Sequence, residues 1–210
     1  MDESAMYITS RAFKNGERIP PQYTQDGQGA RSNISPPLEW YNIPDETVCL
    51  VLIVEDPAPQ MERSPRSFCH WVVLNIPPTL KGLPEHFTTK EHDDDRDELT
   101  QIREGINDFK VPSYFGPKPP VGEHNYEFRL YALDAYPKVP KKPNVDRLKE
   151  AMEGHILKEA VLTGHYSKDQ YGTGNEKGYY PSGVPQLSGP GRAQLKSQHN
   201  NTRVATVAHQ

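Results

Sequence analysis

The sequence predicts a mostly β domain, and three features of the 210-residue chain indicate it. Proline is abundant, with 21 residues, about twice ordinary usage. Most of these prolines precede residue 145, where they disfavour long helices. Several runs rich in β-branched and aromatic residues are bounded by Pro, Gly and Asn, as strands and their turns usually are. A clear helical repeat of apolar residues occurs only once, after residue 143.

Three strands are expected in the first part of the chain. The stretch MYITSRAF (6–13) is strand-like and is followed by loops rich in Gly, Asn and Pro. The run TVCLVLIVED (47–56) is apolar on both faces, which is typical of a central strand. FCHWVVLNI (68–76) is the next strong strand. Residues 79–113 show no regular period, so we expect an irregular region there.

The run NYEFRLYALD (125–134) alternates cleanly and predicts a further strand. Its two faces carry Tyr126, Phe128, Leu130 and Ala132, and Glu127, Arg129, Tyr131 and Leu133.

One helix is expected, over NVDRLKEAMEGHILKEA (144–160). Asn144 is its predicted N-cap, and an apolar stripe at three- and four-residue spacing can lie against a sheet. The stripe consists of Val145, Leu148, Met152 and Ile156. Gly154 weakens a helix, so its presence predicts close packing at that point. AVLTGHY (160–166) predicts a final short strand.

The chain is expected to divide into one domain, 5–168, and a C-terminal tail, 169–210. The tail is rich in Gly and Pro and has no apolar period. It cannot bury enough apolar surface to offset the entropy lost on ordering, so we expect it to be disordered.

Composition excludes several classes of protein. A net charge of −4 and the lack of a Lys/Arg stripe argue against a nucleic-acid surface. No run approaches the ~18 apolar residues of a membrane span, and the acidic N-terminus lacks a secretory apolar region. We therefore expect a cytoplasmic protein. Cys49 and Cys69 lie in apolar runs and are expected to be buried and reduced, with a disulfide between them as the alternative.

Two residues in the predicted strands are candidates for chemistry. Asp56 ends an apolar strand, and Pro57 turns the chain there. The Asp56 carboxylate either caps this turn or faces a cavity. His70 lies in the middle of an apolar strand, where it is either a hydrogen-bonded core residue or part of a site. Strict alternation places His70 on one face with Phe68, Val72 and Leu74, and Trp71 on the other.

The stretch YFGPKPPVGEHNYEF (114–128) predicts a stiff loop that leads into a strand. It delivers His124 and, two residues later on the same face, Tyr126. Two imidazoles, a carboxylate and a phenol can together coordinate a phosphate-like anion. The histidines lack the spacing of a metal site, and no nucleotide-binding glycine pattern occurs. Neither a metal nor a cofactor is therefore predicted.

These segments resemble the phosphatidylethanolamine-binding protein family, and in particular its bacterial-type branch. VEDPAP is similar to the family's D-P-D-A-P box, FCHWVVLNIP to its H-W strand, and YFGPKPPVGEHNYEFRLYALD to its G-P-x-P-P-x-G-x-H-R-Y segment. The resemblance covers about residues 8–166. It implies a large central antiparallel sheet packed on a smaller sheet, with a few peripheral helices and an anion-accepting pocket at one end of the large sheet. The ligand-binding residues that it implies are Asp56, Pro57, His70, Trp71, Pro119, Gly122, His124 and Tyr126.

Two departures from the family pattern bear on the ligand. After Asp56 and Pro57 the second aspartate of the box is missing, so that Ala58 and Pro59 follow directly. Asn125 stands where the family usually has Arg. The pocket is therefore expected to have a different inventory of hydrogen-bonding groups from that of the family.

The resemblance implies a binding module for an anionic or apolar small molecule, with a surface for a protein partner, because family members act as kinase or protease inhibitors and as signalling regulators. The alternative is a cofactor-independent enzyme that dehydrates, isomerises or cyclises a small apolar metabolite. There His70 or His124 takes the proton, Asp56 orients an imidazole, and Tyr126 donates to a developing oxyanion. A third hypothesis is a scaffold role for the tail.

Overall fold

The structure of the protein is a computed structural model. It describes residues 4–26, 33–57, 67–89, 102–120 and 122–167. In chain order its elements are β1 (Tyr7–Thr9), the 3₁₀ helix η1 (Pro21–Tyr23), β2 (Leu38–Tyr41), β3 (Cys49–Asp56), β4 (Phe68–Ile76), β5 (Gly82–Leu83), β6 (Arg103–Glu104), β7 (Glu123–Leu133), α1 (Val145–Met152) and β8 (Ile156–Ser167). The tail predicted over 169–210 lies outside the described residues, so its disorder stays a prediction.

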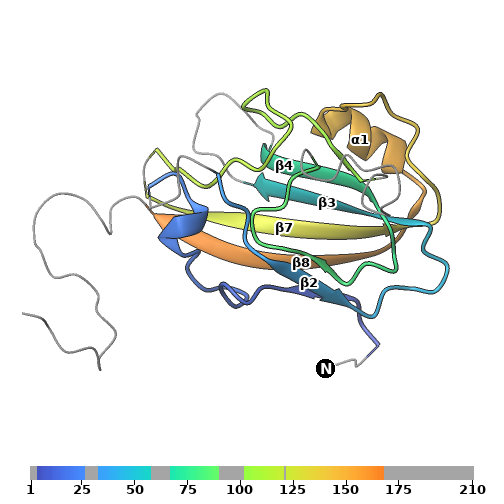
Figure 1. The fold of residues 1–210 in the computed structure, drawn as a ribbon, viewed down its shortest axis with the longest axis horizontal. Coiled ribbons are helices and arrows are strands. Elements are labelled where there is room, and N and C mark those ends of the chain that lie inside the picture. Colours follow the sequence, from blue (N-terminus) through green and yellow to red (C-terminus); the bar gives the residue numbers. More distant parts are fainter. Residues whose placement is uncertain (1–3, 27–32, 58–66, 90–101, 121, 168–210) are drawn as a thin grey trace, which may run out of the picture. The chain divides into compact units, whose positions relative to one another are not determined.

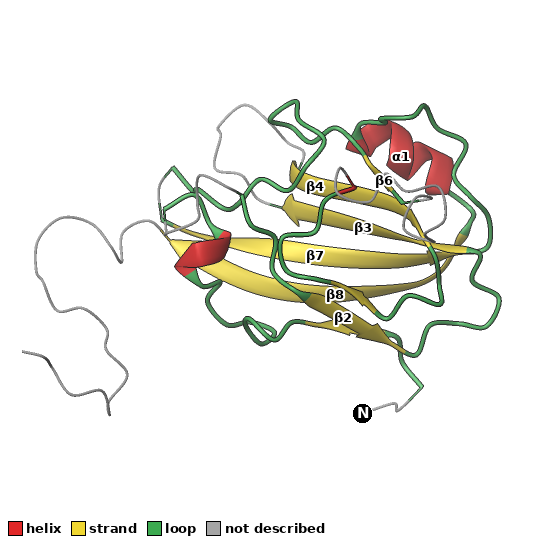
Figure 2. Ribbon diagram, viewed as in Figure 1, coloured by secondary structure: helices red, strands yellow, loops and turns green. Residues whose placement is uncertain are grey.

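Two antiparallel sheets form the described structure, as the mostly β prediction requires (Figures 1 and 2). The large sheet has the strand order β6-β4-β3-β7-β8, and the small sheet has the order β1-β2-β5. The described residues include the α-helix α1 and the 3₁₀ helix η1. The large sheet, the smaller sheet and the peripheral helices of the prediction are therefore confirmed.

The large sheet is covered on both faces by apolar clusters. One cluster fills the space between the two sheets, and we call it the inter-sheet core; it includes Ile8, Trp40, Leu52, Val54, Trp71, Tyr126, Phe128 and Leu130. The other lies beneath α1 on the opposite face and includes Val51, Ile53, Cys69, Val72, Leu74, Leu148 and Met152. Figure 1 shows α1 beside β4 and β3. The run β3 is buried along its whole length, which explains why its sequence is apolar on both faces.

The alternation predicted for 125–134 is confirmed in β7. Phe128 and Leu130 belong to the inter-sheet core, whereas Tyr131 and Leu133 lie in the cluster beneath α1. The period of two is undisturbed because residues 127–133 of β7 pair residue by residue with β3.

The helix predicted over 144–160 is too long, because α1 ends at Met152. Gly154 has a φ of +79°, a left-handed conformation that glycine adopts readily and that stops a helix. Nothing lies within 4 Å of the position that a Cβ at Gly154 would take, so the close packing predicted there is wrong. Ile156 is the first residue of β8 and is exposed, because pairing with β7 overrides the helical pattern.

Two further sequence expectations concern cysteines and membranes. Cys49 and Cys69 are both free and buried, and burial raises the pKa of the Cys49 thiol to about 11. Within the described part of the chain, no helix has the length and apolarity needed to cross a membrane.

The N-cap of α1 gives a test of the fold. The Arg147 backbone N–H donates to the Asn144 side-chain oxygen at 3.0 Å, as the sequence predicts. Replacing Asn144 with alanine should lower the free energy of unfolding by about 1 kcal/mol, because one helix N–H loses its acceptor. Urea unfolding at neutral pH measures this. Asn144→Ser keeps a capping oxygen and should retain most of the stability; equal losses in both variants would contradict the assignment.

Candidate functional site

The candidate site lies at one end of the large sheet, where three neighbouring inner strands begin or end. β3 ends at Asp56, which faces Phe68 at the start of β4. β7 begins beside them, with Glu127 opposite Glu55 of β3. Because neighbouring strands are antiparallel, the end of one strand lies beside the starts of its two neighbours. This arrangement brings Asp56 and His124, which are far apart in the sequence, to the same end of the sheet.

Asp56 and His124 form a buried hydrogen-bonded pair. The His124 Nδ1 lies 2.5 Å from the Asp56 Oδ2, and the two side chains are only 2% and 7% exposed. Since an ionised carboxylate only accepts hydrogen bonds, Nδ1 carries the proton and donates it to Asp56. The carboxylate fixes the orientation of the ring and can compensate a positive charge on it.

The other nitrogen of the same ring has no hydrogen-bond partner among the described residues. His124 Nε2 is buried, and no described group satisfies it. A buried polar atom without a partner is unfavourable by about 1 to 3 kcal/mol, and native proteins contain few of them. The orphaned Nε2 therefore indicates a position where a small polar group can bind.

His70 reaches this site because β4 carries a β-bulge. Val54 of β3 faces Trp71, but the next residue, Glu55, faces Cys69, so His70 is an extra residue in β4. Bulges re-aim side chains and occur often beside functional sites. The His70 ring packs edge-on against Tyr126 of the inter-sheet core, at 5.2 Å between ring centroids.

The bulge overturns the face assignment made from the sequence. Strict alternation predicted that His70 shares a face with Val72 and Leu74 and that Trp71 points the other way. Val72 and Leu74 instead lie beneath α1, whereas Trp71 belongs to the inter-sheet core, on the side that His70 faces. The prediction was correct for Phe68, whose ring lies 5.4 Å from that of His70. One extra residue shifts the parity of the positions that follow it, up to the second irregularity in this pairing, which lies between Leu50 and Leu52 of β3.

The His70 ring is fixed as a neutral tautomer. Its Nδ1 lies 2.7 Å from the Phe115 carbonyl oxygen. A carbonyl only accepts, so Nδ1 carries the proton and Nε2 is left as an acceptor. Burial lowers the pKa of His70, although the Phe115 carbonyl and the nearby Asp56 favour the protonated ring. The two histidines of the site therefore differ: the Nε2 of His70 can accept a hydrogen bond, whereas the Nδ1 of His124 donates to the Asp56 carboxylate.

Tyr126 lies between the two histidines. Its ring is edge-on to His70 and stacked near His124, at 6.5 Å between centroids. Burial raises the pKa of Tyr126 well above its usual range, with Asp56 adding to the effect. The phenol therefore remains protonated at neutral pH and can donate a hydrogen bond.

A buried amide fastens the loop after β6 to the bulge. The Asn107 amide nitrogen donates to the carbonyls of His70, at 3.1 Å, and Ser113, at 2.9 Å. Its oxygen accepts from the Val111 N–H at 3.1 Å. The Phe115 N–H also donates to the His70 carbonyl, at 3.1 Å. The loop and the bulge thus hold each other in place, a role for Asn107 that its polar sequence context did not reveal.

The loop that precedes β7 in the stretch 114–128 is anchored on its other side to the segment around η1. The Tyr114 hydroxyl donates to the Tyr23 carbonyl at 2.8 Å. At Gly116 a Cβ would stand 2.8 Å from that same carbonyl oxygen, so only glycine fits without a shift. Pro119 is buried in this loop. Gly122 has a φ of +69° just before β7, where glycine is favoured.

Two other predicted ligand contacts have different surroundings. Trp71 is fully buried, and its indole N–H donates to the Glu104 carboxylate at 2.8 Å. Pro57 is exposed and lines a hollow of about 460 Å³ on the helix-covered face of the sheet, together with Glu55 and Ser67. Ligand contacts stay predictions for Pro57, Trp71, Pro119 and Gly122, and equally for Asp56, His70, His124 and Tyr126.

The departure at Asn125 does not alter the polar groups beside His124. Asn125 is exposed, whereas His124 and Tyr126 on either side of it are buried. Successive side chains of a strand point to opposite faces, so Asn125 points away from the site. The missing second aspartate of the box falls among residues 58–66, outside the described residues.

A group of phenylalanines beside His70 was not predicted from the sequence. Phe109 stacks on Phe115 at 3.8 Å between centroids and is edge-on to Phe68 at 4.9 Å. Its ring also lies 5.5 Å from that of His70. We call Phe68, Phe109 and Phe115 the phenylalanine wall. Phe109 belongs to the stretch without a regular period, so no pattern in the sequence pointed to it.

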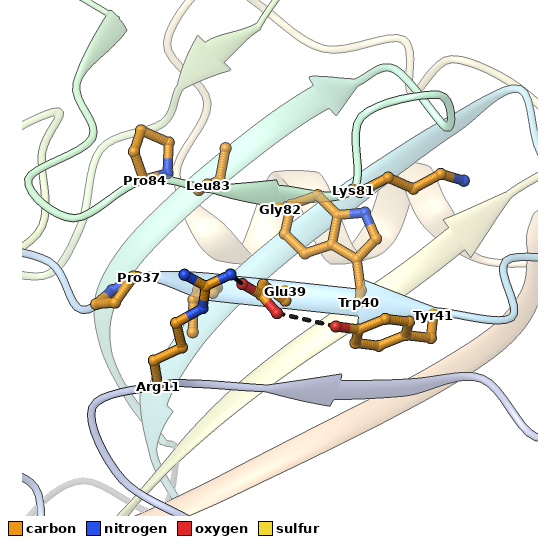
Figure 3. A pocket seen from close by; sticks show the side chains of 10 residues that line it. Arg11, Pro37, Glu39, Trp40, Tyr41, Lys81, Gly82, Leu83 and Pro84 are labelled. Carbon is orange, nitrogen blue, oxygen red and sulfur yellow. Dashed lines mark hydrogen bonds and ion pairs between the residues drawn. The ribbon is translucent and has the colours of Figure 1, made fainter.

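A separate hollow of about 520 Å³ lies against the small sheet, beside β2 and β5 (Figure 3). Two of its polar groups contact Glu39: Arg11 lies 2.5 Å from the Glu39 carboxylate, and the Tyr41 hydroxyl donates to it at 2.9 Å. None of the described residues that line this hollow is a histidine. Among the described residues, no group of three or more His, Cys, Asp or Glu side chains is arranged to hold a metal ion. The site around Asp56, His70, His124 and Tyr126 is therefore the strongest candidate.

Comparisons with known proteins agree with this fold. A family profile described as phosphatidylethanolamine-binding protein matches residues 9–167. The UPF0098 protein of Methanothermobacter thermautotrophicus is 40% identical over 163 residues, which cover 78% of this chain and 99% of that protein. A structure of a phosphatidylethanolamine-binding protein homologue from Chlamydia trachomatis has 36% identity and a TM-score of 0.67, covering 80% of this chain and all of that one. The YbcL protein of Escherichia coli has 28% identity and a TM-score of 0.63, covering 77% and 98%.

The lowered pKa of His70 predicts a dependence of stability on pH. Below the reference value of 6.5 the unfolded chain binds a proton at this position more readily than the folded one. The free energy of unfolding should therefore fall as pH drops from 7.5 to 5.5, and it should fall less in His70→Gln. Urea unfolding at the two pH values measures this difference. His155→Gln, at a half-exposed histidine, should behave like wild type; an unchanged pH dependence in His70→Gln would contradict the assignment.

Proposed function

Because the chain belongs to the phosphatidylethanolamine-binding protein family, we propose that it binds a small anionic ligand of the phosphate or carboxylate class. The ligand binds at the end of the large sheet where β3 ends and β4 and β7 begin. The observation that carries the proposal is the buried His124 Nε2 without a partner. A protonated Nε2 donates a hydrogen bond to an anionic oxygen. Asp56, 2.5 Å from the opposite nitrogen, compensates the charge on the ring.

The other groups of the site suit such a ligand. Tyr126 is a protonated phenol and supplies a second donor. His70 is held in the tautomer whose Nε2 accepts, so it suits a ligand that carries a hydroxyl, such as a monoprotonated phosphate. The ligand then has one oxygen that accepts from His124 and one group that donates to His70.

The same geometry favours a second candidate function, a cofactor-independent enzyme. A carboxylate that orients an imidazole through Nδ1 is the arrangement used in general acid–base catalysis. In Asp56 and His124 this arrangement is formed at 2.5 Å. In that mechanism His124 Nε2 takes a proton from a small apolar metabolite, and the Tyr126 hydroxyl donates to the oxygen on which charge develops. A cytoplasmic location, a protein partner and a scaffold role for residues 169–210 stay predictions.

Titration calorimetry with inorganic phosphate tests the binding proposal. Wild type should bind phosphate, and His124→Gln should bind at least about tenfold more weakly, because a charge-assisted hydrogen bond is lost. Asp56→Asn should also weaken binding, since the ring then loses its compensating charge. His155→Gln serves as the matched control and should bind as wild type does, because His155 lies just before β8, beside Asp134 and away from His124. Equal phosphate affinity in wild type and His124→Gln would contradict the proposal.

Turnover separates the enzyme from the binding module. Candidate metabolites are incubated with the full chain, and products are followed by NMR. An enzyme should lose turnover in His124→Ala by about 10² to 10⁴-fold while His155→Gln keeps it. Turnover that survives in His124→Ala and also in His70→Gln would rule out this mechanism.

A further inference from the structure

The phenylalanine wall is open to solvent at its centre. Phe109 is the middle ring, with Phe115 stacked on it and Phe68 and His70 against its edges. Phe109 is nevertheless 38% exposed to solvent. Large apolar side chains are exposed singly on many proteins, but a cluster of them beside polar groups marks a ligand-binding surface more often.

The wall is continuous with the proposed anion site through a series of ring contacts. The His70 ring lies 5.5 Å from Phe109 on one side and 5.2 Å from Tyr126 on another. Tyr126 in turn stacks near His124 at 6.5 Å. Three successive ring contacts therefore separate the wall from His124, whose Nε2 is the proposed position of the anion.

The wall is also held rigidly before any ligand binds. Asn107, two residues before Phe109, is bonded to the bulge and to Ser113. The Asp108 carboxylate accepts from the Cys69 N–H of β4 at 2.8 Å. A surface that is already ordered loses little entropy on binding, which is how preorganised sites gain affinity.

We propose that the ligand of this site is an aryl-substituted anion, whose phosphate or carboxylate binds at His124 and whose aromatic ring packs on Phe109 and Phe68. This inference rests on the proposed function and names the ligand class for the same site. The ring class follows from geometry: the wall already contains one stacked and two edge-on contacts around Phe109. Aromatic rings continue such arrays better than saturated groups of equal size, because ring edges and faces carry opposite partial charges.

Titration calorimetry of the full chain with methyl, cyclohexyl and phenyl phosphate tests the inference. Wild type should bind phenyl phosphate about tenfold more tightly than methyl phosphate, from the apolar area covered, and more tightly than cyclohexyl phosphate. Phe109→Ala should reduce the ratio of phenyl to methyl affinity to about one. Phe109→Leu keeps an apolar side chain that supports the loop, and it should remove the advantage of phenyl over cyclohexyl phosphate. Thermal unfolding checks that both variants are folded.

Tyr136→Ala is the matched control. Tyr136 is an aromatic residue with 48% exposure that follows β7 at the end of the strand away from His124. Its substitution should leave both ratios unchanged. Binding of methyl phosphate with no preference for phenyl phosphate would overturn the inference and leave the proposed function standing. Equal affinity for cyclohexyl and phenyl phosphate would overturn the aryl assignment, and binding of none of the three would overturn the proposed function itself.

Discussion

The hydrogen bond between Asp56 and His124 is the interaction on which the site depends. It joins two polar side chains that are almost fully buried, and it leaves one nitrogen of the ring without a described partner. Burying such a pair requires that both groups lose their hydration, so the arrangement adds little to stability compared with apolar residues of the same volume. Its structural requirement is strict, because Asp56 must end β3 where β7 begins. These are the features of a group kept for binding or chemistry.

One of the two irregularities in the pairing of β3 with β4 lets β4 serve two purposes. In a regular strand every second residue faces the same layer, so His70 and Trp71 could not both face the inter-sheet core. The bulge at His70 allows Trp71 to fill that core while His70 turns to Tyr126. An extra residue disturbs the ladder and leaves backbone groups to be satisfied. The Asn107 side chain and the Phe115 N–H both donate to the His70 carbonyl. The hydrogen bonds that satisfy the bulge therefore also position the neighbouring loop.

The sequence predicted what regular repetition encodes. The burial of β3, the alternation of β7 and the cap at Asn144 all follow from local patterns. The resemblance to the family motifs predicted that Asp56, His124 and Tyr126 lie near one another. The prediction failed where tertiary pairing overrides a pattern. The predicted helical stripe continued to Ile156, but in the structure Ile156 belongs to β8 and pairs with Leu133 of β7. The bulge has no signal of its own in the sequence, because one inserted residue in a strand looks like any other.

The polar and the apolar groups of the proposed site lie on different kinds of element. Asp56, His70, His124 and Tyr126 lie on strands, whose positions the two packed cores determine. Phe109 and Phe115 lie on a loop that is tied to β4 by side-chain hydrogen bonds. Loops vary more readily than the strands that support them. Asn125 points away from the site, so its departure from the family pattern leaves the strand-borne polar groups intact. In the proposed site, selectivity for one ligand over another anion therefore rests on the loop from 107 to 115.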